Sequence, residues 1–147
     1  MKDSYSGNDP SVPVRRDEDP FLLNALVLAY IGDTLYDLYV RTRLVRSSHA
    51  SAGTLHRKAI HFVCAEGQAR SVKALIPELT EKETEIVKRA RNAKSTTVPK
   101  HASIDDYHHA TAFEALLGFL YLSGQQERCD TIMKMAYDIR SEGDKNV

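Results

Sequence analysis

The stretch FLLNALVLAYIGDTLY, from Phe21 to Tyr36, predicts a buried helix, because its apolar residues are too continuous for a helix that lies at the surface. Asp33 is the only charged residue in it. An unpaired polar group in apolar surroundings costs on the order of 2–7 kcal/mol, and an ionised group costs more. The chain must therefore supply Asp33 with a cation, a metal ion or a network of hydrogen bonds.

A second apolar stretch, YHHATAFEALLGFLYLSGQQ from Tyr107 to Gln126, repeats this situation, with Glu114 as its only acid. Two isolated acids in two apolar helices predict one shared site, provided that the helices pack together. Such a pair suits Mg²⁺, which takes one or two protein carboxylates, keeps several waters and binds substrate phosphate oxygens. A metal ion of this kind supports attack on a phosphodiester.

A structural explanation of both acids is also open, and the residues alone slightly favour it. Asp33 follows Gly32 and would cap a second helical segment if the helix were interrupted there. Glu114 would pair with a basic residue or with His108.

The composition is that of a soluble protein with one domain. The chain has 147 residues, of which 42% are hydrophobic and 27% are charged. Twenty basic and twenty acidic residues give zero formal net charge, so a nucleic acid must be bound by a local patch. Cys64 and Cys129 are too few for a disulfide framework or a zinc site. The sequence has no signal peptide or membrane span, and we expect a cytoplasmic protein with no membrane partner.

Helix start and stop signals divide the chain into helices, and no strand alternation competes with them. Residues 1–19 combine prolines and charges with few apolar side chains, and we expect a flexible tail there. Asp19 and Pro20 predict the start of a first helix that runs to about Val45. Further helices are predicted over 54–76, 81–94, 104–123 and 126–141, with 142–147 as a C-terminal tail. The predicted fold class is all-α.

A basic strip follows the third of these helices. The stretch VKRARNAKSTTVPKHASI, from Val87 to Ile104, contains no acid. We interpret it as a phosphate-binding surface. The residues predicted to bind RNA are Lys88, Arg89, Arg91, Asn92, Lys94 and Lys100. A solvated helix end, where the helix dipole favours basic residues, is the alternative interpretation.

Three motifs now point to a family. LNALVLAYIGDTLYDLYVR resembles the signature region of the ribonuclease III catalytic domain, in which a Gly-Asp pair ends an apolar run. ATAFEALLGFLYL resembles the second acidic motif of that domain, and Glu114 matches its metal-binding glutamate. KRARNAKS followed by VPK is similar to the basic segment of the small branch, Mini-ribonuclease III. The motifs occur in the expected order over about residues 20–140.

The resemblance implies an all-α endonuclease domain over residues 20–141 that acts as a homodimer on double-stranded or structured RNA with Mg²⁺. Asp33 and Glu114 would be the catalytic and metal-binding residues, and the basic strip would hold the RNA. No double-stranded-RNA-binding domain is expected. The small branch is associated with maturation of large-subunit (23S) ribosomal RNA, which makes the 23S precursor the implied partner. The resemblance leaves open whether a ribosomal protein presents this substrate.

The chain departs from the longer ribonuclease III enzymes at three positions. Those enzymes carry acids where this chain has Leu26, Ala29 and Thr111. We therefore expect a site with only two acids and weaker metal affinity, and the number of metal ions per site is open.

Two other functions remain open from the residues. One is a metal-dependent nucleotide phosphohydrolase with His108, His109 and Asp105 as ligands. The other is a non-catalytic RNA-binding module that uses only the basic strip.

The first helix itself favours a homodimer. Tyr30, Tyr36, Tyr39 and neighbouring aliphatic residues give it more apolar surface than a small bundle covers, and an isologous contact would cover that surface. A central helix contacted on all sides is the alternative.

Overall fold

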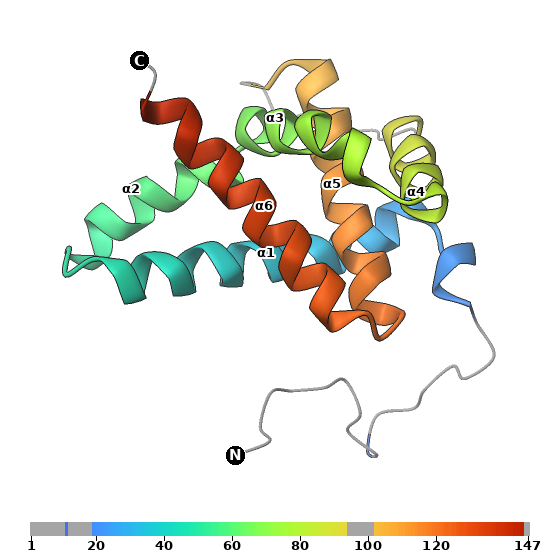
Figure 1. Cartoon of the computed structure of the whole chain (residues 1–147), viewed down its shortest axis with the longest axis horizontal. Coiled ribbons are helices and arrows are strands. Elements are labelled where there is room, and N and C mark those ends of the chain that lie inside the picture. Colours follow the sequence, from blue (N-terminus) through green and yellow to red (C-terminus); the bar gives the residue numbers. More distant parts are fainter. Residues whose placement is uncertain (1–10, 12–18, 94–101, 146–147) are drawn as a thin grey trace.

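The computed structural model describes residues 11, 19–93 and 102–145, and within them the chain is helical and contains no strand (Figure 1). The predicted all-α fold class is confirmed. The elements are η1 (Pro20–Leu22), α1 (Ala25–Ser47), α2 (Ala52–Val63), α3 (Ala65–Leu75), η2 (Ile76–Glu78), α4 (Glu81–Arg91), α5 (Ile104–Leu122) and α6 (Gln126–Lys145). None of these helices is long and apolar enough to cross a membrane.

Helix α5 is the centre of the fold and packs against α1, α3, α4 and α6 (Figure 1). Its residues from His109 to Leu120 are buried on every side of the helix except at Glu114. A helix that is apolar all round must be enclosed by others, which explains its position. The fully buried side chains of Phe113, Leu116 and Leu120 form the middle of the core.

Helix α1 has one buried face and one exposed face. Leu28, Tyr36 and Val40 are buried against the core. The opposite face carries Val27 and Tyr30, which are 53% and 83% exposed. The alternative in which the first helix is contacted on all sides is therefore wrong for the chain as described.

The exposed apolar surface of α1 also differs from the predicted one. Tyr36 is buried, Tyr39 is half-buried, and of the three tyrosines only Tyr30 is exposed. Leu38, which is 64% exposed, continues the surface instead.

The start of the first helix is later than predicted. Asp19 does act as a cap, but for the short η1, where its carboxylate accepts from the Phe21 amide at 3.0 Å. Asn24 caps α1 by accepting from the Leu26 amide at 2.8 Å. From there α1 continues through Gly32 without interruption. Asp33 is therefore not the cap of a second helical segment.

The single helix predicted over 54–76 is wrong, because it breaks at Cys64. The backbone there is extended, with ψ of 160°, and the residue ends α2 and caps α3. Its Sγ accepts from the Gly67 amide at 3.4 Å. A thiol is an unusual cap, and the apolar spacing continues across the break, so the sequence pattern did not reveal it.

The other helix ends are close to the predictions. Thr80 and Glu83 form the predicted capping box of α4, and Ser103 caps α5. Helix α6 continues to Lys145, beyond the predicted end at 141. Most of the expected N-terminal tail, together with Lys94 and Lys100, lies outside the described residues.

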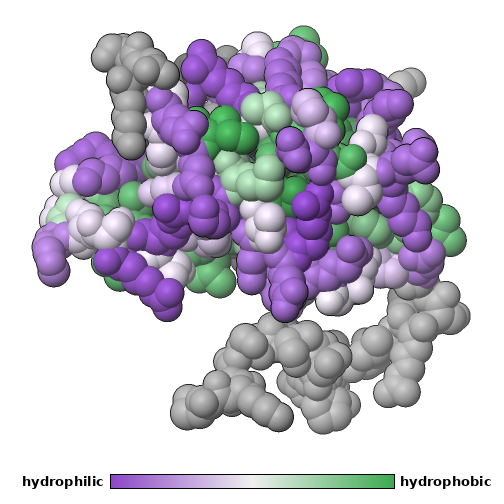
Figure 2. All heavy atoms as spheres, viewed as in Figure 1, coloured by the Kyte–Doolittle hydropathy of each residue, from purple (hydrophilic) through white to green (hydrophobic). Residues whose placement is uncertain are grey.

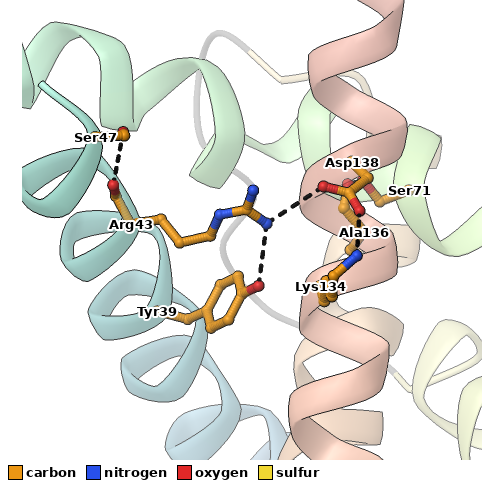
Figure 3. A network of polar contacts seen from close by, with 7 residues as sticks. All are labelled: Tyr39, Arg43, Ser47, Ser71, Lys134, Ala136 and Asp138. Carbon is orange, nitrogen blue, oxygen red and sulfur yellow. Dashed lines mark hydrogen bonds and ion pairs between the residues drawn. The ribbon is translucent and has the colours of Figure 1, made fainter.

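Two side-chain networks attach α6 to the rest of the bundle. Arg128 forms two hydrogen bonds with the buried carboxylate of Glu83 on α4, at 2.8 and 3.0 Å. Arg43 reaches from α1 to the Tyr39 hydroxyl at 3.2 Å and to Asp138 on α6 at 3.3 Å (Figure 3).

Candidate active site

Two glycines bring the backbones of α1 and α5 into direct contact. A Cβ atom on Gly32 would lie 1.7 Å from the carbonyl oxygen of Glu114. A Cβ atom on Gly118 would lie 1.9 Å from the carbonyl oxygen of Leu28. Since neither backbone can yield as a flexible side chain would, only glycine fits at these two positions. The two contacts are reciprocal, with one glycine supplied by each helix.

This crossing places the two isolated acids together, as predicted. Asp33 follows Gly32 directly, and Glu114 is the residue that Gly32 contacts. The two carboxyl groups share a hydrogen bond. Asp33 is exposed and Glu114 is half-buried, so the pair opens to solvent on the Asp33 side.

Burial raises the pKa of Glu114 to about 9, and the charge of Asp33 and the hydrogen bond to Asp33 act in the same direction. At neutral pH the Glu114 carboxyl group therefore keeps its proton. A divalent cation can replace this proton and neutralise both carboxylates. Two carboxylates beside open solvent fit Mg²⁺, which keeps most of its waters.

The surroundings add no further acid to the pair. Ala29 is buried, and the Thr111 hydroxyl donates to the Tyr107 carbonyl oxygen at 3.0 Å. Asp37, one helical turn beyond Asp33, accepts from Arg41 Nε at 3.0 Å. Across residues 19–93 and 102–145, no group of three or more histidine, cysteine or acidic side chains is placed to hold a metal ion. The expectation of a site with only two acids stays a prediction.

The alternative histidine site does not form. Nδ1 of His108 lies 2.8 Å from the Arg91 carbonyl oxygen, and Nδ1 of His109 lies 2.9 Å from the Asp105 carbonyl oxygen. The Asp105 carboxylate accepts from Lys73 Nζ at 2.8 Å. Asp105 Oδ1 also lies 3.3 Å from His109 Nδ1, but no group of three such side chains among the described residues is placed to hold a metal ion. The partner of Glu114 is Asp33 and not His108.

The basic strip is only partly available for a ligand. Lys88 and Asn92 at the end of α4 are exposed, and Arg91 is half-buried. The Arg89 guanidinium donates to the carbonyl oxygens of Phe21 and Leu23. It also lies over the Phe21 ring, 5.1 Å from its centroid. Arg89 therefore holds the segment that precedes α1, a structural contact that its place in a basic run did not reveal.

Gly32 and Gly118 are the site residues whose part the sequence reasoning missed. Each is an isolated glycine inside an apolar helical pattern, which signals either a bend or a close contact between backbones. At Gly32 the sequence leaves an interruption of the helix open, and the structure contains a close contact between backbones instead.

Comparisons with known proteins identify one family. The family described as "Ribonuclease III domain" matches residues 26–125, a range that includes both acids. The chain is 40% identical over 142 residues to "Mini-ribonuclease 3" of Thermoanaerobacter sp. (strain X514), which covers 97% of this chain and 100% of that protein. It is 48% identical over 121 residues to "Mini-ribonuclease 3" of Brevibacillus brevis, covering 82% and 90%. A crystal structure of a Fusobacterium nucleatum protein superposes with a TM-score of 0.75 at 30% identity, covering 83% of this chain and 98% of that one.

Proposed function

The chain belongs to the ribonuclease III family and is an endoribonuclease. We propose that it cleaves double-stranded RNA with Mg²⁺, and that Asp33 and Glu114 hold this ion. The observation that carries the proposal is the hydrogen-bonded pair of carboxyl groups at the glycine crossing of α1 and α5. Such a pair is costly to keep in an apolar bundle, and binding of a cation offsets that cost.

The two acids have different parts in the proposed reaction. When bound, Mg²⁺ supplies a hydroxide nucleophile from water and stabilises charge on the phosphodiester. Glu114, half-buried on α5, loses its proton to bind the ion. Asp33 is the exposed carboxylate, so it is the one that orients the attacking water from the solvent side. In the hydrolysis, the water oxygen gives up a proton and bonds to phosphorus, the bond from phosphorus to the leaving ribose oxygen breaks, and that oxygen takes up a proton.

The basic strip is the proposed contact with the RNA backbone. Lys88, Arg91 and Asn92 supply donors at the end of α4, and the acid-free sequence continues through Lys94 and Lys100. Arg89 is excluded from this contact, because its guanidinium is engaged with the segment before α1. The 23S ribosomal RNA precursor is the substrate that the family branch suggests.

A homodimer is the proposed assembly. Val27, Tyr30 and Leu38 form an exposed apolar surface along α1. A second copy of the chain would cover this surface through an isologous contact. The same contact would bring two carboxyl pairs to one duplex.

The substrate and the metal can be tested together. A duplex RNA and each of its separated strands are incubated with the protein, once with Mg²⁺ and once with EDTA. We expect defined products from the duplex with Mg²⁺ and none in the other five incubations. Equal cleavage of the single strands would contradict the proposed substrate. Cleavage of the duplex in EDTA would contradict the proposed metal.

A further inference from the structure

A second acid-free region lies at the other end of α1. From Leu38 to Ala65 the sequence contains no aspartate or glutamate. This region forms the C-terminal half of α1, the loop that follows it, and α2. Its basic residues are Arg41, Arg43, Arg46, Arg57 and Lys58, and its histidines are His49, His56 and His61. Helices α2 and α4 lie at opposite sides of the molecule, so this region is separate from the basic strip (Figure 1).

Two of these five cations already have acidic partners. Arg43 bonds to Asp138 at 3.3 Å and lies over the Tyr137 ring, 4.0 Å from its centroid (Figure 3). Arg41 pairs with Asp37 at 3.0 Å. Both cations are therefore used within the protein.

The remaining three cations are exposed at the corner between α1 and α2. Arg46, Arg57 and Lys58 are all solvent-exposed. Hydrophilic residues predominate on the face of the molecule drawn in Figure 2. None of the three cations forms an ion pair with a carboxylate of the described residues, and Arg57 donates to the Thr54 hydroxyl at 3.0 Å. Arg46 lies in the last turn of α1, and Arg57 and Lys58 lie in the middle of α2, the helix that packs against it. In a chain of zero net charge, three cations without acidic partners on two adjoining helices give this part of the surface a local positive charge that can bind a polyanion.

We propose that Arg46, Arg57 and Lys58 are a second contact for the backbone of duplex RNA, which we call the α1–α2 contact. The inference rests on the proposed function. Arg46 follows Asp33 by thirteen residues on the same uninterrupted helix, which corresponds to about 20 Å at 1.5 Å per residue. The α1–α2 contact is therefore held at a fixed distance from the carboxyl pair. It favours substrates whose duplex extends at least that far beyond the bond that is cleaved.

The test uses a catalytically inactive parent, so that binding is measured without cleavage. Affinity for a long duplex RNA is measured over a series of salt concentrations for D33N and for D33N with R46Q, R57Q and K58Q. The logarithm of the binding constant falls as the logarithm of the salt concentration rises, and each lost phosphate contact makes this slope less steep by about 0.9. We therefore expect the slope of the combined variant to be less steep by about 2–3. R70Q is the matched control, because Arg70 is an exposed cation on α3 that is paired with Glu66, and its slope should not change.

A shortened duplex makes the test specific for position. On a duplex too short to extend about 20 Å beyond the carboxyl pair, the parent and the combined variant should bind with the same slope. An unchanged slope on the long duplex would overturn the α1–α2 contact, while binding by the parent would leave the proposed function intact. Failure of the parent to bind any duplex would overturn both. An unchanged RNA slope with lost binding to phosphatidylserine vesicles would assign the corner to a membrane surface instead.

Discussion

Gly32 contacts the backbone of Glu114 so closely that a methyl group on Gly32 would lie 1.7 Å from the Glu114 carbonyl oxygen. The same crossing brings the Asp33 side chain to the Glu114 carboxyl group. The packing of α1 on α5 and the formation of the carboxyl pair are thus one structural event. A change that separates the two helices must also separate the two acids.

The G32A variant tests this dependence. The added methyl group must push the backbones apart, and overpacking of this kind costs about 1–3 kcal/mol or more of unfolding free energy. We expect RNA cleavage to fall further than the folded fraction falls, because Asp33 and Glu114 move apart even in molecules that stay folded. Urea unfolding and cleavage rates at saturating substrate measure the two effects.

Gly143 provides the control for that experiment. A Cβ atom there would meet nothing within 4 Å, and the residue is exposed on α6. G143A should raise the unfolding free energy by about 0.5–1 kcal/mol and leave cleavage unchanged. If G32A behaved like G143A, the close crossing would have no role in forming the site.

The pH dependence of stability tests the environment of Glu114. Burial raises the pKa of Glu114 to about 9, whereas the unfolded chain has the ordinary value of 4.5. Between these values the folded state keeps a proton that the unfolded state has lost. The contribution of Glu114 to stability is therefore complete below pH 4.5 and is lost as the pH rises towards 9.

Comparison of the wild type with E114Q isolates this contribution. We compare the two proteins in EDTA by the difference between their unfolding free energies, E114Q minus wild type. We expect this difference to increase with pH, by at most about 1.4 kcal/mol per pH unit. Denaturant unfolding at several pH values measures the difference. A difference that stays constant from pH 5 to pH 9 would show that the Glu114 carboxyl group is not held protonated.

Substitution of Arg128 tests the network that joins α4 and α6. The Glu83 side chain is only 4% exposed and depends on Arg128 for two hydrogen bonds. R128A leaves this carboxylate buried without its charged partner and should lower the unfolding free energy by about 1–3 kcal/mol. K134A, which breaks the exposed pair of Lys134 with Asp138, should change it by less than about 1 kcal/mol. Equal effects of the two variants on thermal unfolding would contradict the assignment.

The basic strip offers a contrast between neighbouring cations. Lys88 is exposed, so K88A should leave the melting temperature unchanged and make the salt slope of RNA binding less steep by about 1. Arg89 holds the carbonyl oxygens of Phe21 and Leu23, so R89A should lower the melting temperature. If instead R89A changed the salt slope and K88A lowered the melting temperature, the RNA contact would lie at Arg89.

The sequence predicts the parts of this protein that depend on local pattern. Continuous apolar residues predict the two helices of the core, and the anomaly of an acid in each predicts the pairing of Asp33 with Glu114. Thr80 and Glu83 predict their own capping box. The break at Cys64 was not predictable, because helical spacing continues across it and the thiol cap forms only in the folded bundle.

Contacts between distant segments account for the other differences. Gly32 is compatible with a bend until its neighbour on α5 is known. Arg89 and Lys88 are neighbouring cations in the same basic run. Only the contact of Arg89 with Phe21, far away in the sequence, shows that Arg89 has a structural role.

The most direct test of the central claim is single-turnover cleavage of a duplex RNA with Mg²⁺ by D33N and by E114Q, each shown to be folded by circular dichroism. Each variant keeps its shape and loses one of the two carboxylates proposed to hold the ion. We predict that the cleavage rate falls by about 100-fold or more in both, which corresponds to about 3 kcal/mol or more of lost transition-state stabilisation. Cleavage at the wild-type rate by both folded variants would contradict the claim that this carboxyl pair is the active site.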